Sequence, residues 1–461
     1  MDDVEFLSSL VAPCKYDRSS KELLRNIQDR RLRVHLRKAY RRVPYWHQLL
    51  DDADIKPDDI RTVDDLSKIP LTTKDGILSR PTRHRLSSDP SRLSQRYTSG
   101  TTGPPMDAYY STGFTVSTFL YLYDHYRRWF GLGRFYKVLQ ISSVPPTTRP
   151  PGSKPGVATP SSTWKRRARG ESRAGSSIMW PVIDRFARSV HFDRRIETVL
   201  PTIEAFAPDA IMINASHLRM LADHAGETVA SVRPKVLFST GEPLDEPTRG
   251  YVERRLGSPV RQMYGSNETG PLALDCLEGS GLHIFSDRAI VEVLSKDGEP
   301  VSPGELGEIV VTELMNDGMP LFRYKTRDLA YSSSESCSCG RSLPLLKSVE
   351  GRQIDCITTH DGRVVTPKRI LTLMHSVEGL PRCQLIQRAP GSFSLRIFSG
   401  SDERVSQHDD SIPELLGALR TELGQRADIS VSMAQGDELP KRKMRPVIVQ
   451  MAARSEPSPP S

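Results

Sequence analysis

Residues 196–240 read IETVLPTIEAFAPDAIMINASHLRMLADHAGETVASVRPKVLFST, and this stretch decides the fold class. Residues 196–208 and 217–226 carry apolar side chains at helical spacing. The segments DAIMIN (209–214) and PKVLFST (234–240) are short apolar runs typical of buried strands. The same alternation continues through one more helix and one more strand. Because strands that alternate with helices need crossover connections, the pattern predicts an α/β fold with a mostly parallel sheet flanked by helices.

After this α/β stretch the sequence changes character. The segments AIVEVL (289–294) and GELGEIVVTEL (304–314), bounded by Gly and Pro turns, predict a β-rich subdomain. The end of the chain mixes short strands and helices, as in a small α+β domain. We therefore expect an N-terminal domain over 1–350 and a C-terminal domain over 351–461. Residues 145–178 are rich in Pro, Ser, Gly and Arg, a composition that predicts a flexible surface insertion.

Composition narrows the class of protein. Lys and Arg outnumber Asp and Glu by 64 to 56, but much of the excess is scattered arginine, which favours a solvated surface with one anion-binding pocket over a nucleic-acid surface. No apolar run approaches the length of about 18 residues that indicates a membrane span. The start, MDDVEFLSSL, lacks the basic and apolar regions of a secretory signal. Six cysteines without a regular framework favour a reducing cytoplasm, and we expect neither a nucleic-acid nor a membrane partner.

A loop of small polar residues, YTSGTTGPP, occupies positions 97–105. Its glycines allow the backbone to point several N–H groups inward, and the neighbouring hydroxyls add donors without bulk. Such a loop suits a chain of phosphates, although it is not a P-loop, because no Gly-Lys-Ser/Thr follows. By itself it is equally compatible with a polar surface turn. The residues predicted to bind phosphate are Ser99, Gly100, Thr101, Thr102 and Gly103.

Two further polar segments, STGEPL (239–244) and YGSNETG (264–270), follow predicted strands, where ligands sit in parallel sheets. Within the second segment, Tyr264 can stack on a base and Glu268 can hold Mg²⁺ against phosphate oxygens. Asp328 lies just past an apolar strand and can accept hydrogen bonds from ribose hydroxyls.

Cationic groups follow later in the chain. Arg352, in GRQID (351–355), offers a planar donor suited to ribose or phosphate. Lys441 and Lys443, in LPKRKMRP (439–446), can reach carboxylate and α-phosphate oxygens and stabilise charge as it develops. Each segment is a weak signal alone, whereas all of them in this order are hard to attribute to chance.

A separate group of residues has the chemistry of a metal site. Cys337 and Cys339 form a Cys-Ser-Cys turn, and Cys276 and His283 lie upstream of it. Together they supply the four ligands that tetrahedral zinc prefers. We expect a structural zinc ion that ties the β-rich subdomain together; the alternative is a set of free thiols and a surface histidine.

The order of these segments resembles the adenylate-forming acyl-ligase superfamily, in particular its phenylacetate–coenzyme A ligase-like branch. The motifs VPYWHQLL (43–50), KIPLTTKDGI (68–77), GELGEIVVTEL (304–314) and CSCGRSLPLLKSVEGR (337–352) support that branch. The similarity runs from about residue 30 to the end, and the insertion at 145–178 is the part that looks foreign to it. The motifs are specific to the family but not to a substrate.

The resemblance implies a two-step reaction. A carboxylate attacks the α-phosphate of ATP to give an acyl-adenylate and pyrophosphate, and a nucleophile such as coenzyme A then displaces AMP. It also implies that the 99–103 loop cradles the phosphates, that Tyr264 with Gly265 packs on the adenine, and that Asp328 holds the ribose. By the same resemblance Glu268 binds Mg²⁺ and Lys443 serves the adenylation step. The residues implied to flank the adenine are Ser239, Gly241, Glu242 and Pro243.

The resemblance further implies a small aromatic acid as substrate, a homodimer, and a small mobile α+β C-terminal domain that rotates between the half-reactions. The sequence departs from the family pattern at several positions. Arg327 replaces a glycine before Asp328, Ile354 replaces a hinge acid, and Arg442 replaces a glycine before Lys443. Because several of these changes touch the domain rotation and the second half-reaction, an amine acceptor, giving an amide, competes with coenzyme A. A degenerate member that binds nucleotide without turnover is the third hypothesis.

Overall fold

The computed structural model describes residues 16–97, 106–142, 186–191, 196–380, 382–399, 411–435 and 445–450. The chain divides into two compact units. The first comprises the residues up to Glu242 together with Val252–Val349, and the second comprises Pro243–Tyr251 together with the residues from Glu350 onward. The insertion predicted at 145–178 lies outside the described residues.

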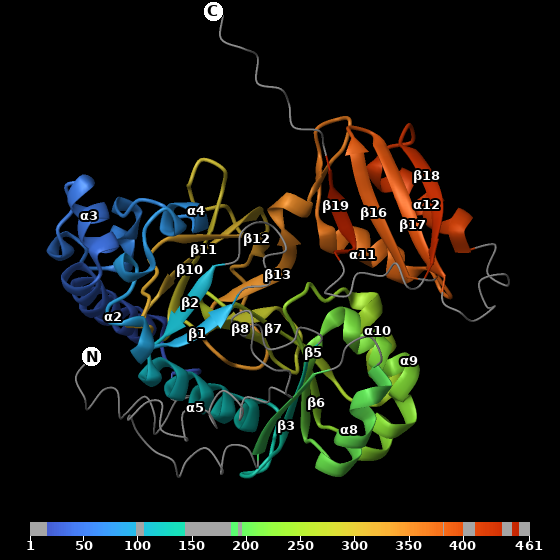
Figure 1. Cartoon of the computed structure of the whole chain (residues 1–461), viewed down its shortest axis with the longest axis horizontal. Helices are drawn as coiled ribbons and strands as arrows, with labels where there is room; N and C mark the ends of the chain where they lie inside the picture. The colour runs from blue at the N-terminus through green and yellow to red at the C-terminus, as the bar shows by residue number, and fades with distance from the viewer. Residues whose placement is uncertain are drawn as a thin grey trace, which may run out of the picture. The chain divides into compact units, whose positions relative to one another are not determined.

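The α/β alternation of the sequence forms the parallel part of one large sheet (Figure 1). Its strands are β3 (Val138–Ser142), β4 (Ala187–His191), β5 (Ala210–Asn214), β6 (Val236–Thr240) and β7 (Val260–Ser266). Neighbours in the order β4-β3-β5-β6-β7 all pair in parallel. The helices that alternate with them are η6 (Ile196–Val199), α8 (Leu200–Phe206), α9 (Ala215–Val232) and α10 (Glu246–Leu256). The alternation that begins at 196 therefore predicted the elements from η6 to β7, whereas β3 and β4 precede it and were not predicted.

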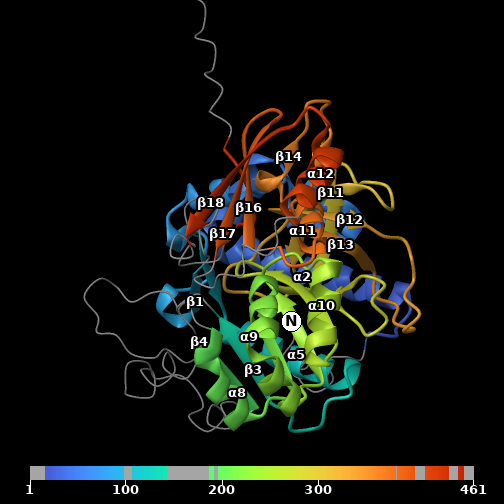
Figure 2. The ribbon, with the colours of Figure 1, turned by 90° about the vertical axis from the view of Figure 1, so that its right-hand side faces the viewer.

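Helices cover both faces of the parallel strands. On one face, α5 (Thr112–Trp129) places Tyr126 on Phe238 of β6, with ring centroids 4.3 Å apart, inside a buried apolar cluster. Helix α9 contacts β5 and β6 and packs against α8. Figures 1 and 2 show α5 on one side of these strands and the α8–α9 pair on the other. This layering leaves the strand ends, where the predicted site residues lie, uncovered by these helices.

The β-rich segment of the sequence forms the antiparallel part of the same sheet, whose order continues β7-β8-β9-β13-β12-β11-β10. The predicted β-rich subdomain thus shares its hydrogen-bond ladder with the parallel strands, and the sheet as a whole is mixed. The ladder changes from parallel to antiparallel at β7, where the chain turns back directly into β8 through residues 267–269. The strands are β8 (Gly270–Asp275), β9 (Leu282–Ile284), β10 (Ala289–Leu294), β11 (Leu306–Glu313), β12 (Tyr324–Ser332) and β13 (Leu345–Arg352).

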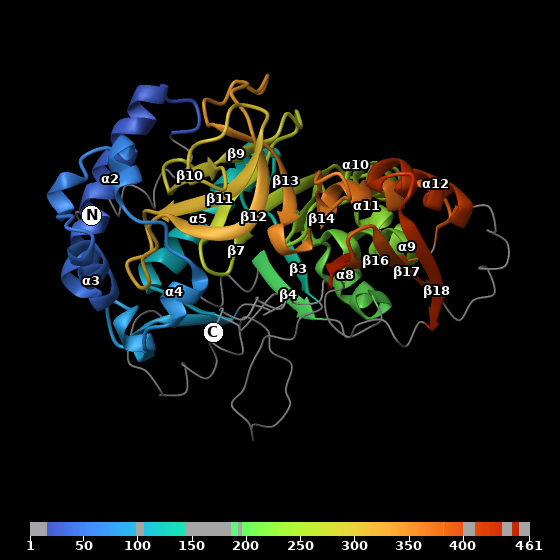
Figure 3. The ribbon, with the colours of Figure 1, turned by 90° about the horizontal axis from the view of Figure 1, so that it is seen from above.

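The first unit begins with the helices α2 and α3, followed by short helical turns and strands. Ser20 caps the first helix by accepting a hydrogen bond from the Leu23 N–H (3.1 Å), and Pro44 suits the first turn of the next one because that position needs no N–H donor. Figure 3 shows this helix pair beyond β10, and Leu36 shares a buried cluster with Ile290 of that strand. The elements are α2 (Lys21–Arg42), α3 (Pro44–Asp52), η1 (Pro57–Asp59), η2 (Val63–Lys68), α4 (Lys74–Leu78), η3 (Thr82–His84), η4 (Pro90–Arg92), β1 (Ser94–Tyr97) and β2 (Asp107–Tyr110).

The second unit is a small α+β structure, as the sequence predicts. Its main sheet has the order β18-β17-β16-β19, with an antiparallel centre and a parallel pair on each side. Leu385 and Leu395 of this sheet pack with Leu415 and Leu419 in one buried cluster. Of the helices in the described ranges, none is long and apolar enough to traverse a bilayer. The elements are η7 (Gln353–Asp355), β14 (Ile357–Thr358), β15 (Val364–Val365), α11 (Pro367–Ser376), β16 (Arg382–Ala389), β17 (Ser392–Ser399), α12 (Ser411–Leu423), β18 (Asp428–Gln435) and β19 (Val447–Val449).

Candidate functional site

The end of β6 carries the first predicted segment. Ser239 is fully buried, and its hydroxyl has no hydrogen-bond partner in the described part of the chain. Gly241 follows with a φ of 70°, in the left-handed region that favours glycine. Oε2 of Glu242 then accepts a hydrogen bond from the backbone N–H of Ser216 (2.8 Å), which satisfies one free donor in the first turn of α9. The segment therefore presents a buried hydroxyl beside a carboxylate that caps a helix.

The end of β7 carries the second predicted segment, which closes into a tight turn. Oγ of Ser266 accepts hydrogen bonds from the backbone N–H groups of Glu268 (3.1 Å) and Thr269 (3.2 Å). Tyr264 and Glu268 are 7% and 9% exposed. The turn thus fixes an aromatic ring and a carboxylate close together, with little access to water.

The hydroxyl of Tyr264 contacts a residue that is distant in sequence. It donates a hydrogen bond to Oδ2 of Asp328 in β12 (3.0 Å). Because β7 and β12 are not neighbours in the sheet, this bond joins two separate strands. The structure therefore brings together the residues predicted to bind adenine and ribose.

Another strand contacts the same turn. Tyr110 ends β2, the strand that follows the predicted phosphate loop, and its hydroxyl donates a hydrogen bond to the backbone carbonyl of Asn267 (2.7 Å). Burial raises the pKa of Tyr110 well above its usual value, and the charge of Glu268 raises it further. The sequence analysis missed Tyr110; its signal was the aromatic pair in DAYY (107–110), close behind a Ser/Thr/Gly loop.

The remaining predicted residues fall into two groups. Lys443 and the phosphate loop Ser99–Gly103 are outside the described residues. Pro243 and Arg352 belong to the second unit. There Gly351, with a φ of 105°, has a Cβ position only 3.2 Å from Cγ of Pro243, so Pro243 lies beside the residue that precedes Arg352.

The four predicted zinc ligands come together in the first unit. Their ligand atoms all lie within 4.8 Å of one another, with Cys276 Sγ 3.5 Å from Cys337 Sγ and Cys339 Sγ 3.4 Å from His283 Nε2. Two ligands of a tetrahedral zinc ion, at bond lengths of about 2.0–2.3 Å, are separated by roughly 3.4–3.8 Å. The spacing of the two closest pairs fits this ion.

The donor chemistry of this cluster fits a cation as well. Burial raises the pKa of Cys276 to about 12 and lowers the pKa of His283 to about 4. A neutral imidazole is the form that binds metal, and a bound cation would offset the cost of a buried thiolate. Arg18 donates a hydrogen bond to the carbonyl of Cys339 (3.1 Å), so the cluster also fastens the N-terminal segment.

Comparison with known proteins identifies relatives of this chain. No protein-family profile matches the sequence. The chain is 27% identical over 386 residues to phenylacetate-coenzyme A ligase of Thermus thermophilus, a match that covers 81% of this chain and 80% of that protein. It is 28% identical over 323 residues to phenylacetate-coenzyme A ligase of Escherichia coli, which covers 68% of each. The chain is therefore similar to phenylacetate-coenzyme A ligases over most of its length.

The fold of this chain is similar to that of 2-hydroxyisobutyryl-CoA ligase in its postadenylation state in complex with R3-HIB-AMP. The TM-score is 0.74 at 17% identity, and the match covers 95% of this chain and 92% of that chain. The resemblance drawn from the sequence motifs is therefore confirmed.

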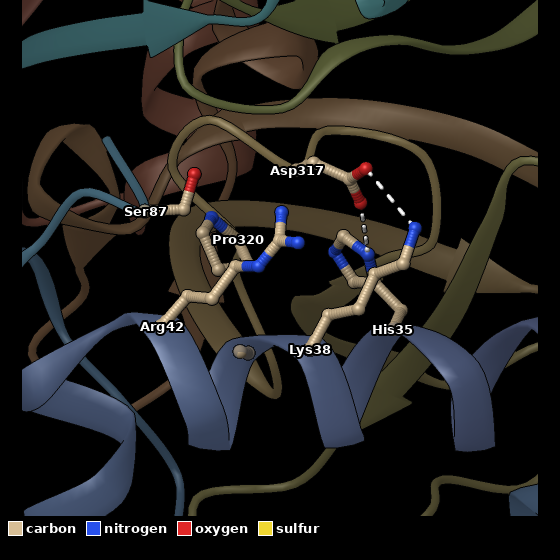
Figure 4. A pocket seen from close by; sticks show the side chains of 7 residues that line it. His35, Lys38, Arg42, Ser87, Asp317 and Pro320 are labelled. Atoms are coloured by element: carbon tan, nitrogen blue, oxygen red, sulfur yellow. Dashed lines mark hydrogen bonds and ion pairs between the residues drawn. The ribbon is translucent and has the colours of Figure 1, made fainter. Parts of the chain in front are cut away.

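One small pocket of the described structure lies between α2 and the loop that joins β11 to β12 (Figure 4). Figure 4 shows His35 and Lys38 pointing from α2 toward Asp317, with His35 Nδ1 3.2 Å from Oδ1 and Lys38 Nζ 3.3 Å from Oδ2. Its lining residues in the described structure include none of the predicted site residues. Ion pairs between the helix and the loop therefore line this pocket.

Proposed function

We propose that this protein is an ATP-dependent ligase that activates a small aromatic carboxylic acid and transfers its acyl group to coenzyme A. In the first step a carboxylate oxygen bonds to the α-phosphorus of ATP, the bond to the bridging β-phosphate oxygen breaks, and pyrophosphate leaves. In the second step the thiol of coenzyme A loses its proton and bonds to the acyl carbon, and AMP leaves. Homology to the phenylacetate-coenzyme A ligases supports this reaction class.

One observation carries the assignment of the nucleotide site, namely the hydrogen bond from the Tyr264 hydroxyl to Asp328 (3.0 Å). It puts an aromatic face suited to a base next to a carboxylate suited to ribose hydroxyls. The contact between Tyr110 and the carbonyl of Asn267 ties the strand leaving the predicted phosphate loop to the same turn. Base, ribose and phosphates would then bind in the order in which ATP joins them.

The other residues take their roles in this proposal from the resemblance. Glu268 holds Mg²⁺, whose chemistry is to neutralise charge on the phosphate oxygens. Lys443 stabilises the charge that develops on the α-phosphate as the acid attacks. The remaining nucleotide-binding residues are Ser99, Gly100, Thr101, Thr102, Gly103, Ser239, Gly241, Glu242, Pro243, Gly265 and Arg352.

A structural zinc ion held by Cys276, His283, Cys337 and Cys339 is part of the proposal. The spacing and burial of the four ligands support it. Zinc in such a closed site contributes to folding rather than to the reaction. We also propose that the protein acts in the cytoplasm, as a homodimer and without a nucleic-acid partner.

One feature favours a second candidate, in which an amine replaces coenzyme A and the product is an amide. Ile354 stands where the family has a hinge acid, and its side chain is 50% exposed. An exposed apolar residue at the hinge changes the segment about which the C-terminal domain is expected to rotate for the second half-reaction. The adenylation step is common to both candidates.

Carboxylate-dependent exchange of pyrophosphate into ATP tests the shared first step. We expect exchange with members of an aromatic acid panel, and we expect Lys443→Ala to reduce it at least about 100-fold with nearly unchanged ATP affinity, because the lysine acts mainly in the transition state. Consumption of coenzyme A against consumption of an amine then separates the two acceptors. Silence of the wild type across a broad panel of acids would instead favour a protein that binds nucleotide without turnover.

A further inference from the structure

The pairing of β11 with β12 is interrupted next to Asp328. The register shifts between Glu308 and Val310 of β11, so that the single residue between them faces residues 326–328 of β12. A β-bulge of this kind bends its strand and redirects side chains, and bulges are frequent beside active sites. The direction in which Asp328 points is therefore set by the geometry of this bulge.

Arg327 lies at the centre of the bulge in the left-handed conformation, with a φ of 63°. Glycine adopts this conformation freely, whereas an arginine is strained in it. Oε1 of Glu308 accepts a hydrogen bond from the Arg327 N–H (3.1 Å), and Oγ1 of Thr326 accepts one from the Asp328 N–H (3.1 Å). Side chains thus hold the strained backbone in place.

The guanidinium of Arg327 fastens the bulge to α4. Its Nη2 pairs with Oδ2 of Asp75, in the first turn of that helix. The chain just before α4 is also bonded to β12, since the Thr72 N–H donates to the Arg323 carbonyl and the Lys325 N–H donates to the Thr72 carbonyl, both at 2.9 Å. The segment around α4 therefore holds β12 by backbone bonds before the bulge and by an ion pair within it.

We propose that Arg327 and Asp75 form a strap that positions Asp328 to receive the ribose hydroxyls of ATP. The inference rests on the proposed function, and it assigns both residues as positioning residues that act through Asp328. The Tyr264 hydroxyl donates a hydrogen bond to the carboxylate of Asp328 (3.0 Å). An aspartate whose preceding backbone and carboxylate are both held needs little further ordering when the ribose binds, which favours affinity. Loss of the ion pair frees the strained backbone to rotate Asp328 away.

Calorimetric titration with ATP tests the strap without requiring the acid substrate. Asp75→Asn and Arg327→Gln each remove the ion pair, and we expect each to raise the Kd of ATP about three- to fivefold, the effect of one exposed pair. The double variant should bind no more weakly than either single variant, because both changes remove the same interaction. For 2′,3′-dideoxyadenosine triphosphate, which lacks both ribose hydroxyls, the Kd should not change in any variant.

Two further variants separate positioning from stability. Arg327→Gly removes the pair and the backbone strain together, so we expect weaker ATP binding with a melting temperature at or above that of the wild type. Arg37→Gln removes a comparable exposed pair with Asp58 (2.7 Å) and should leave the Kd unchanged. Wild-type affinity in the strap variants, or an equal loss of affinity for the dideoxynucleotide, overturns the strap alone. A wild-type protein that binds no ATP overturns the proposed function and the strap with it.

Discussion

At position 265, between the ring of Tyr264 and the turn at Ser266, a side chain has no room. A Cβ there would lie 2.4 Å from the carbonyl oxygen of Gly270 and 2.8 Å from Cα of Pro271. Both are backbone atoms, which cannot move without disturbing the pairing of β7 with β8. We therefore expect Gly265→Ala to lower the free energy of unfolding by about 1–3 kcal/mol, measured by urea denaturation, and to weaken ATP binding.

A matched change shows whether the effect belongs to this site. In the described part of the chain, no atom beyond its two neighbours lies within 4 Å of the Cβ position of Gly133, so Gly133→Ala should leave both stability and ATP binding close to those of the wild type. If Gly265→Ala were as stable as Gly133→Ala, the turn after β7 would be free to move, and the tight approach to Gly270 would have no energetic weight.

At the candidate site the sequence suggested residue types but not their contacts. Tyr264 and Asp328 were predicted from an aromatic and a carboxylate near the ends of apolar segments, and the structure joins the two side chains by a hydrogen bond. The pair of Arg327 with Asp75 spans 252 residues. An arginine in the left-handed conformation also contradicts its local preference, so no local pattern could have predicted either feature.

At the scale of secondary-structure elements, ion pairs join α2 to the loop after β11. Burial raises the pKa of Asp317, but the hydrogen bond and charge of His35, together with Lys38, outweigh it and hold the pKa well below its usual value. A carboxyl whose pKa is lower in the folded state stabilises the fold above its unfolded pKa of about 3.9, and this contribution is lost as the pH falls toward the folded pKa. We expect the difference in unfolding free energy between wild type and Asp317→Asn to stay level above about pH 5 and to shrink as the pH falls from about 5 toward about 2.

Urea denaturation across that range measures the effect. Because the side chain of Asp317 is 46% exposed, the difference near neutral pH should be modest, at about 1 kcal/mol or less. Asp58, which is 75% exposed in its pair with Arg37, offers a control, and Asp58→Asn should change the unfolding free energy near neutral pH by less. A constant gap for Asp317→Asn at every pH would show that the carboxyl does not titrate differently in the folded state.

For the whole molecule, periodicity predicted three strands of the parallel part of the sheet but did not predict β3, β4 or how far the sheet continues. Helix and strand repeats between 196 and 265 predicted β5 to β7 because each crossover is local in sequence. The continuation into β8 depends on the turn at 267–269, and β13 pairs with β9 through Leu345 and His283, a contact between distant segments. Nothing in the periodicity of either strand specifies that partner. The sequence therefore predicted a β-rich subdomain without predicting that it joins the parallel strands.

The Cys/His cluster links several of these distant segments, so its metal content should affect the stability of the whole first unit. Cys276 follows β8, His283 lies in β9, and the other two ligands lie between β12 and β13. We expect about one zinc per chain by elemental analysis, and we expect Cys276→Ser or strong chelation to remove it and to lower the melting temperature by at least about 5 °C. Cys356 lies outside the cluster, so Cys356→Ser should retain the metal. A metal-free protein with an unchanged melting temperature would show that hydrogen bonds and packing alone hold these strands together.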